Sequence, residues 1–361
     1  MRRTRHLALV EPGDGASPTV PVRSLLTNRV HNLTLAKLGE LLAFSARDWT
    51  WQVDRSATSL AERGLLVSDE PGDPFEPLRR RDAELSELGW HPAAAAFHLA
   101  TLWDRPKLRI ARRNQPRSPV RQPPATAPPT PFYTRGGDRL ELPAASREGE
   151  LRRLLDARRT VRSFDTEQPV TASELATLLD AVWGAHARTP LAFGDTALRK
   201  TSPSGGGLHP VEVYPVVCRV GGVPPGVYHY LAGERTLERL SSRDEEACAG
   251  LLERSTAGQW YLADADVGFV MTARFARSFW KYRHHEKAFR TILLDAGHLS
   301  QTFYLACVEL GLGAYVTAAL DDGELSRALN LDPLFEAPVA LCGCGRPAQR
   351  PGPLEPQFHR L

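Results

Sequence analysis

The sequence lacks long apolar runs, paired cysteines and a strong excess of either charge. No apolar run approaches the roughly 20 residues of a membrane-spanning helix. The arginine-rich start has an apolar run of only four residues before Glu11, too short for a signal peptide core. The five cysteines are odd in number, scattered and without a CxxC pair, which argues against a disulfide framework and a structural zinc site. We expect a cytoplasmic protein without membrane contact and without a metal.

Charge is distributed unevenly behind the net value of +3. Residues 105–137 hold eight basic and no acidic residues, and the rest of the chain has 37 basic against 42 acidic. The same stretch is rich in proline and has no apolar periodicity, which predicts an extended linker. At low ionic strength this basic strip is expected to attract an acidic leader peptide.

Residues 1–104 are expected to form a small N-terminal module. Helices are predicted at 33–44, 54–64 and 91–103, with a short strand at 65–67, an order that resembles a winged helix. Residues 31–70 hold four basic and six acidic side chains, which disfavours nucleic-acid binding. A peptide-docking role and a simple packing role remain open.

Residues 138–361 alternate helical and strand patterns, which predicts an α+β domain with helices covering a sheet. The two kinds of element are expected at these ranges: helices at 148–158, 173–186, 244–254, 285–311 and 322–330, and strands at 211–220, 227–230, 266–275, 314–320 and 339–344. In this pattern Cys342 and Cys344 share one face of the last strand and are expected to be buried. The apolar stripe of the helix at 285–311 is first a core or subunit-interface face.

Two clusters in this half suit an anionic, flat ligand. Arg158, Arg159, Thr160 and Arg162 offer guanidinium and hydroxyl donors for a phosphate, although a solvated charge run would look the same. The loop at 201–210 has three consecutive glycines, so its backbone can approach a flat ligand closely, although a tight turn is the plainer alternative.

A third cluster is the pair Lys281 and Tyr282. The chain has five lysines among 45 basic residues, so arginine is used wherever charge alone is needed. A lysine beside a tyrosine after an aromatic run is therefore a candidate for proton transfer, which arginine cannot perform. A surface lysine is the competing interpretation.

Taken together, these motifs resemble the FMN-dependent nitroreductase superfamily, and within it the SagB-type thiazole/oxazole-forming dehydrogenases of peptide maturation. The similarity spans residues 151–347 and rests on the following segments: RRTVRSF (158–164), SPSGGGLHPVEVY (202–214), PPGVYHY (224–230), KYR (281–283), LLDAGHLSQTFYLA (293–306) and GLGA (311–314). The third glycine and Leu208 depart from the usual loop, which affects expected substrate contacts more than flavin binding.

The resemblance implies a role for each cluster. Arg158, Arg159 and Thr160 would hold the FMN phosphate, and Arg162 would lie near flavin N1 and O2. The loop residues Pro203, Ser204, Gly205 and Gly206 would lie against the isoalloxazine edge, and Gly313 and Arg346 would be further flavin contacts. Lys281 and Tyr282 would be catalytic. FMN would bind at a homodimer interface, and the N-terminal module would resemble the peptide-recognition modules that such enzymes often carry.

The expected reaction is oxidation of an azoline ring of a modified precursor peptide to an azole, by proton abstraction and hydride transfer to flavin N5. Partners would be the precursor peptide and a cyclodehydratase or other maturation enzyme. Two alternatives stay open: an NAD(P)H-fed FMN reductase of a dehydroamino acid, nitro or other electron-poor substrate, and a non-catalytic peptide-docking scaffold for a partner synthetase.

Overall fold

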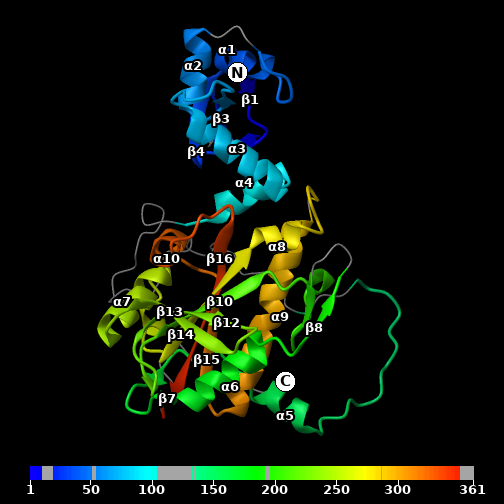
Figure 1. Ribbon diagram of the computed structural model, residues 1–361. Helices are drawn as coiled ribbons and strands as arrows, with labels where there is room; N and C mark the ends of the chain where they lie inside the picture. Colours follow the sequence, from blue (N-terminus) through cyan, green and yellow to red (C-terminus); the bar gives the residue numbers. More distant parts are fainter. Residues whose placement is uncertain are drawn as a thin grey trace, which may run out of the picture.

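The computed structural model describes residues 1–9, 19–50, 54–103, 132, 135–191, 196–285 and 287–349. Nearly all of the predicted basic linker therefore lies outside the described residues. A small N-terminal module stands above a larger sheet-containing domain in Figure 1, and helix α4 lies closest to the junction between them.

The larger domain is built on a seven-stranded antiparallel sheet. Six strands follow the order β13–β12–β10–β14–β16–β15, and β6 pairs with the end of β16. The strands are β6 (Phe164–Asp165), β10 (Val211–Val217), β12 (Gly226–Leu231), β13 (Thr236–Ser242), β14 (Val267–Arg274), β15 (Gly313–Thr317) and β16 (Glu336–Pro347).

Helices cover both faces of this sheet, so its central strands are apolar on both sides. Along β14, Phe269 and Met271 pack into the core under α6 (Ala172–Trp183) and α9 (Ala288–Glu309), whereas Val270 packs under α7 (Glu245–Ser255) and α10 (Asp322–Leu329). This alternation is the period of two that a pleated strand imposes. Figure 1 shows α7 and α9 on opposite sides of the sheet.

The expected α+β architecture is confirmed, and the predicted helices and strands of this half are present with shifted ends. All five cysteines are buried and unpaired, and Cys342 and Cys344 fill the core on the α9 side as expected. The sequence analysis missed the seven-residue hairpin strand β13 and several short elements: α8 (Phe275–Phe279), β7 (Val170–Thr171), β8 (Ala187–Pro190), β9 (Thr196–Arg199) and β11 (Val220–Gly221).

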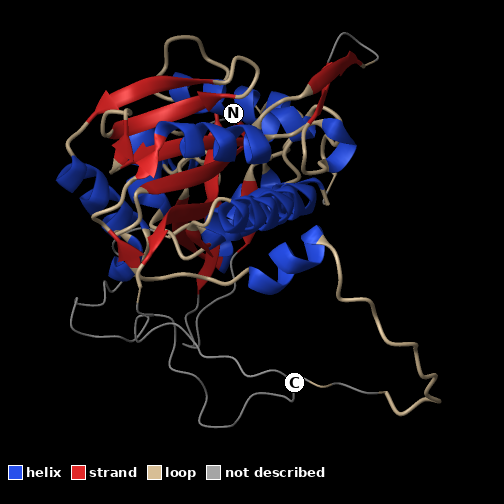
Figure 2. Cartoon of the chain, turned by 90° about the horizontal axis from the view of Figure 1, so that it is seen from below, coloured by secondary structure: helices blue, strands red, loops and turns tan. Residues whose placement is uncertain are grey.

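Helix α5 (Glu150–Ala157) and the extended segment before it lie at the periphery of the domain. Residues 135–149 are exposed, and Figure 2 shows this segment running away from the folded body before it enters α5. None of the side chains of α5 is buried, and Leu151 and Leu155 are 63% and 41% exposed. The helix therefore presents an apolar face that the described part of the chain leaves exposed.

The N-terminal module contains more strand than the sequence analysis expected. A three-stranded antiparallel sheet and a separate β1–β5 pair accompany its four helices. The elements are β1 (Arg2–Arg3), β2 (Leu7–Leu9), β3 (Thr19–Ser24), β4 (Arg29–Thr34), α1 (Leu35–Ala43), α2 (Arg55–Glu62), β5 (Leu66–Val67), α3 (Glu76–Leu88) and α4 (Pro92–Thr101). The predicted helices at α1, α2 and α4 are present.

Helix α3 was not predicted because its apolar stripe is interrupted. Leu78 and Leu85 face inward, but the position between them on that face is Asp82, in a run of charged residues. Asp82 is completely buried and accepts hydrogen bonds from Arg2 Nη2, at 2.6 Å, and from the Thr4 hydroxyl. A buried ion pair thus replaces the apolar contact that a sequence pattern would detect.

None of the helices in the described ranges combines the length and the hydrophobicity that a membrane span requires. Among the same residues no three His, Cys, Asp or Glu side chains gather as a candidate metal site.

Candidate functional site

The glycine loop meets the Lys281–Tyr282 pair. Gly206 has a φ of +68°, which only glycine adopts readily, in the short turn Gly205–Gly207 before β10. A Cβ at Gly206 would lie 3.0 Å from both Lys281 Nζ and Tyr282 Oη. The missing side chain therefore leaves room at the point where two proton-carrying atoms converge.

A carboxylate on α9 holds this loop. Asp295 is 4% exposed and accepts hydrogen bonds from Ser204 Oγ at 2.5 Å and from the Gly205 amide at 3.1 Å. Ser204 Oγ in turn accepts from the His209 amide at 2.9 Å. Burial raises the pKa of Asp295, and the bonds from Ser204 and Gly205 oppose that rise. Sequence analysis did not single out Asp295, although a lone acidic residue in an apolar helical stripe was a usable signal.

The two lysines near this loop have different surroundings. Lys281 is exposed. Lys200, which sequence analysis counted but did not select, is half-buried, and burial lowers its pKa. The pKa of the nearby His209 is lowered to about 4, chiefly by burial and next by the positive charge of Lys200. A neutral His209 donates from Nε2 to the Leu198 carbonyl at 3.0 Å.

Behind the loop, a cleft of about 430 Å³ opens between β9, β10 and β12. Its polar lining includes Lys200, His209, Glu212, His229 and Arg274. Glu212 pairs with Arg274 at 3.0 Å and lies 3.4 Å from His229 Nε2. The cleft thus offers polar groups next to the loop, since Leu208 and His209 also line it.

The predicted phosphate residues lie further along α9, around Tyr304. The Arg158 guanidinium lies over the Tyr304 ring at 5.3 Å, and Thr160 Oγ1 is 3.0 Å from the Tyr304 hydroxyl. Arg159 is exposed and Arg162 is half-buried. Among the described residues, Arg158 and Arg159 have no carboxylate within ion-pair distance, so their charge is available for an anion.

Gly313 and Arg346 lie next to this group, but both already have structural roles. A Cβ at Gly313 would lie 2.8 Å from the Val161 side chain, so this glycine lets β15 pack against the 158–162 segment. The Arg346 guanidinium binds the Glu174 carboxylate at 2.7 and 3.0 Å. Their contact with a flavin remains a prediction.

One helix connects the two groups of residues. Asp295 and Tyr304 are nine positions apart on α9, which corresponds to about 14 Å along its axis. The glycine loop that meets Lys281 and Tyr282 therefore lies at one level of α9, and the cationic segment 158–162 lies at another.

Comparisons with known proteins identify the family of this chain. A model described as the nitroreductase family matches residues 155–346, more than half of the chain. The chain is 31% identical over 211 residues to MJ1384 of Methanocaldococcus jannaschii, a protein named as a nitroreductase, and covers 98% of that protein and 58% of itself.

Two further relatives are named for peptide processing. The chain is 32% identical over 149 residues to the trifolitoxin-processing protein TfxB of Rhizobium leguminosarum bv. trifolii, which is 40% of this chain and 38% of that protein. It is 28% identical over 151 residues to the microcin B17-processing protein McbC of Escherichia coli, which is 40% of this chain and 53% of that protein. The chain thus spans roughly two fifths to half of these two relatives.

Proposed function

The chain belongs to the nitroreductase family, and from this membership we propose that it is an FMN-dependent dehydrogenase that oxidises azoline rings of a modified precursor peptide to azoles. One observation carries the proposal: Lys281 Nζ and Tyr282 Oη converge on Gly206, in a turn of three glycines. The peptide substrate is supported by the names of TfxB and McbC, which describe peptide processing in those two proteins.

The residues present fit FMN at two places. The space beside Gly206, which any Cβ at that position would fill, suits the flat isoalloxazine ring of FMN. Arg158 and Arg159, which have no described carboxylate partner, and the Thr160 hydroxyl suit the phosphate, with Arg162 near the ring. Bound FMN would supply a two-electron hydride acceptor that molecular oxygen could reoxidise.

The protein contributes proton transfer and positioning. Lys281 or Tyr282 removes a proton from the azoline carbon next to nitrogen. Asp295 keeps the glycine loop at a fixed distance from this pair by accepting from Ser204 and Gly205. Lys281 is exposed, so it can be reached by the substrate, and we expect the substrate and a second subunit to cover it.

We further propose a homodimer with FMN at the subunit interface. The exposed leucines of α5 and the 45% and 57% exposed Leu293 and Leu294 on α9 are apolar surfaces that a second copy would cover. The precursor peptide and a cyclodehydratase are the other partners we expect. The N-terminal module, residues 1–104, would dock the peptide, and the domain beginning near residue 138 would oxidise it.

Lys281→Arg and Lys281→Ala, with Tyr282→Phe as a companion, test the role of the pair. Arginine keeps the positive charge but cannot give up its proton at neutral pH. If Lys281 is the base, both lysine variants lose about 100-fold or more in azoline oxidation while FMN content is unchanged. Product and flavin reduction are measured by mass spectrometry and absorbance. Full activity of Lys281→Arg would show that charge alone matters.

The same assay separates the alternatives. Similarity to MJ1384 over nearly its whole length favours the reductase alternative as the second candidate. Rapid bleaching of the flavin by NADH or NADPH, without oxidation of azoline peptides, would establish that function instead. Unchanged product formation by Lys281→Ala in the presence of the partner synthetase would favour the scaffold.

A further inference from the structure

The loop that carries Lys281 and Tyr282 is bound on one side by the N-terminal module. The His284 amide donates to the Gly89 carbonyl at 2.8 Å, and Gly89 is the residue that ends α3. His284 itself has a φ of +54°, an uncommon conformation for a non-glycine residue. The contact therefore holds a constrained backbone two residues after Tyr282.

Trp90 contacts the elements on both sides of this loop. It is 3% exposed, and its ring centroid lies 4.7 Å from Phe275 and 4.6 Å from Phe279, both on α8 before the loop. The ring of Phe289, on α9 after the loop, lies 5.9 Å away. Trp90 Nε1 donates to the Leu334 carbonyl at 2.8 Å, which fixes the indole orientation.

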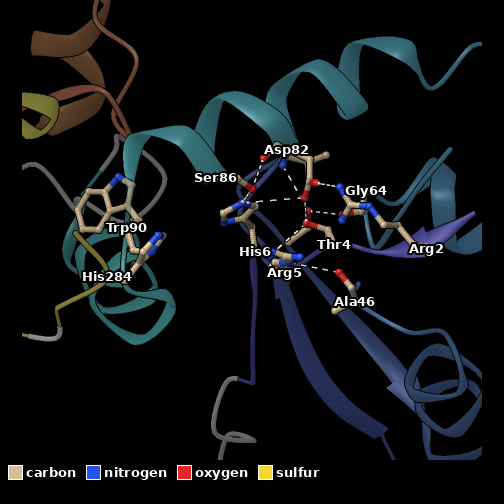
Figure 3. A network of polar contacts seen from close by, with 12 residues as sticks. Arg2, Thr4, Arg5, His6, Ala46, Gly64, Asp82, Ser86, Trp90 and His284 are labelled. Atoms are coloured by element: carbon tan, nitrogen blue, oxygen red, sulfur yellow. Dashed lines mark hydrogen bonds and ion pairs between the residues drawn. The ribbon is translucent and has the colours of Figure 1, made fainter. Parts of the chain in front are cut away.

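Helix α3 transmits this anchoring to the rest of the module. Its middle is tied to β1 by the buried Arg2–Asp82 ion pair, and Arg81 pairs with Asp332 of the larger domain. Figure 3 shows Asp82 and its partners at one part of α3, and Trp90 beside His284 where the helix ends. Because α3 is bound both to β1 and to the larger domain, the backbone of Gly89 and Trp90 that follows it has little freedom to move.

We infer that the N-terminal module positions the proposed catalytic pair, through Gly89 and Trp90, in addition to any contact it makes with a peptide. Gly89 and Trp90 are positioning residues, because they act through the 281–285 loop. The inference rests on the proposed function for its effect on oxidation, but the mechanical link to the loop stands on the contacts alone.

Two glycines of the module provide a matched pair of variants. Gly72 and Gly89 flank α3 and have φ values of +76° and +84°, so alanine introduces similar backbone strain at both. A Cβ at Gly72 would meet nothing within 4 Å, whereas one at Gly89 would lie 3.2 Å from Arg283 Cγ and 3.5 Å from Arg283 Cα. The variants thus differ in whether they push on the loop.

The experiment compares Gly89→Ala and Gly72→Ala in the full chain with FMN bound. Hydrogen exchange followed by mass spectrometry should show at least tenfold faster exchange in residues 281–285 for Gly89→Ala and wild-type exchange for Gly72→Ala. The kcat for azoline oxidation should fall at least tenfold in Gly89→Ala, with KM and FMN content changed less than twofold. Equal exchange and equal kcat in the two variants would overturn the inference.

Further variants separate this idea from the proposed function. Trp90→Phe keeps an aromatic ring and should retain most activity, whereas Trp90→Leu should behave like Gly89→Ala. Unchanged hydrogen exchange in the central strand β14 would show that each variant is still folded. In a Lys281→Ala background, Gly89→Ala should lower kcat no further. If Lys281→Ala is fully active, the proposed catalytic role fails, while faster exchange of the loop in Gly89→Ala still supports positioning.

Discussion

The two levels of α9 differ in how far one chain completes them. At the first level, the Asp295 carboxylate accepts hydrogen bonds from Ser204 and Gly205. The nearby 281–285 loop is anchored by aromatic packing between the elements that flank it and the N-terminal module. Near Tyr304, Arg158 and Arg159 have no described carboxylate partner, and the apolar face of α5 is exposed. The first level has its hydrogen-bond partners within the chain, whereas in the proposed function the second would gain its partners from the FMN phosphate and a second subunit.

The largest expected effect is at the completed level. Asp295→Ala removes the acceptor of two hydrogen bonds, one of them to a backbone amide, and we expect it to lower the free energy of unfolding by about 3 kcal/mol. Azoline oxidation should fall at least tenfold because the loop loses its fixed position. Urea unfolding and steady-state rates check this. Asp295→Asn, which keeps one acceptor oxygen, is the control and should lose about half as much free energy.

The contact between His98 on α4 and Pro333 of the larger domain should become less stable at acidic pH. Burial lowers the pKa of His98 to about 4 from an ordinary value of 6.5, and its Nε2 donates to the Pro333 carbonyl at 2.7 Å. The unfolded chain binds a proton here below pH 6.5 while the folded chain does not until about pH 4. The free energy of unfolding therefore falls as pH drops through that window, by about 3 kcal/mol from this group.

Chemical unfolding at pH 7.5 and pH 4.5 measures this loss. His98→Gln retains a side-chain donor but has no proton to gain, so its unfolding free energy should fall less across the same interval. Parallel losses in wild type and variant would assign the acid sensitivity to other groups, such as His209, whose pKa is also lowered to about 4.

The smallest expected effect is at the incomplete level. Arg158→Gln should weaken FMN binding about tenfold, or about 1.4 kcal/mol, because one phosphate donor and its charge are lost. Folding should be little affected, since Arg158 contacts mainly the Tyr304 ring. Arg152→Gln makes the same change in charge on α5, where Arg152 pairs with Asp156, and should leave FMN affinity unchanged. Fluorescence titration of FMN compares the two.

Much of the larger domain could be predicted because its pattern is local. The spacing of apolar residues reveals strands that are buried on both faces, such as β14, and long amphipathic helices, such as α9. The nitroreductase family that the motifs resembled is confirmed, and so is the similarity to peptide-processing members. Short strands without a continuous pattern, such as β7 and β11, were missed.

The candidate site was predictable in its parts and less so in its arrangement. The glycine loop and Lys281 stood out by composition. The hydrogen bonds from Ser204 and Gly205 to Asp295, however, require α9 to pass beside a loop about 90 positions earlier in the chain. Helix α3 was hidden because Asp82 takes an apolar position and is neutralised by Arg2, a partner 80 positions away. Sequence spacing does not encode such distant pairs.

The sequence by itself determined the element pattern, the anion-binding and glycine-rich motifs, and the family they point to, because these depend on residue type and spacing along the chain. Tertiary structure alone decided that Lys281 and Tyr282 meet Gly206, that Lys281 is exposed in one chain, and that Trp90 and Gly89 hold the neighbouring loop. Those properties arise from packing between segments far apart in the chain, where burial and contact depend on the whole fold.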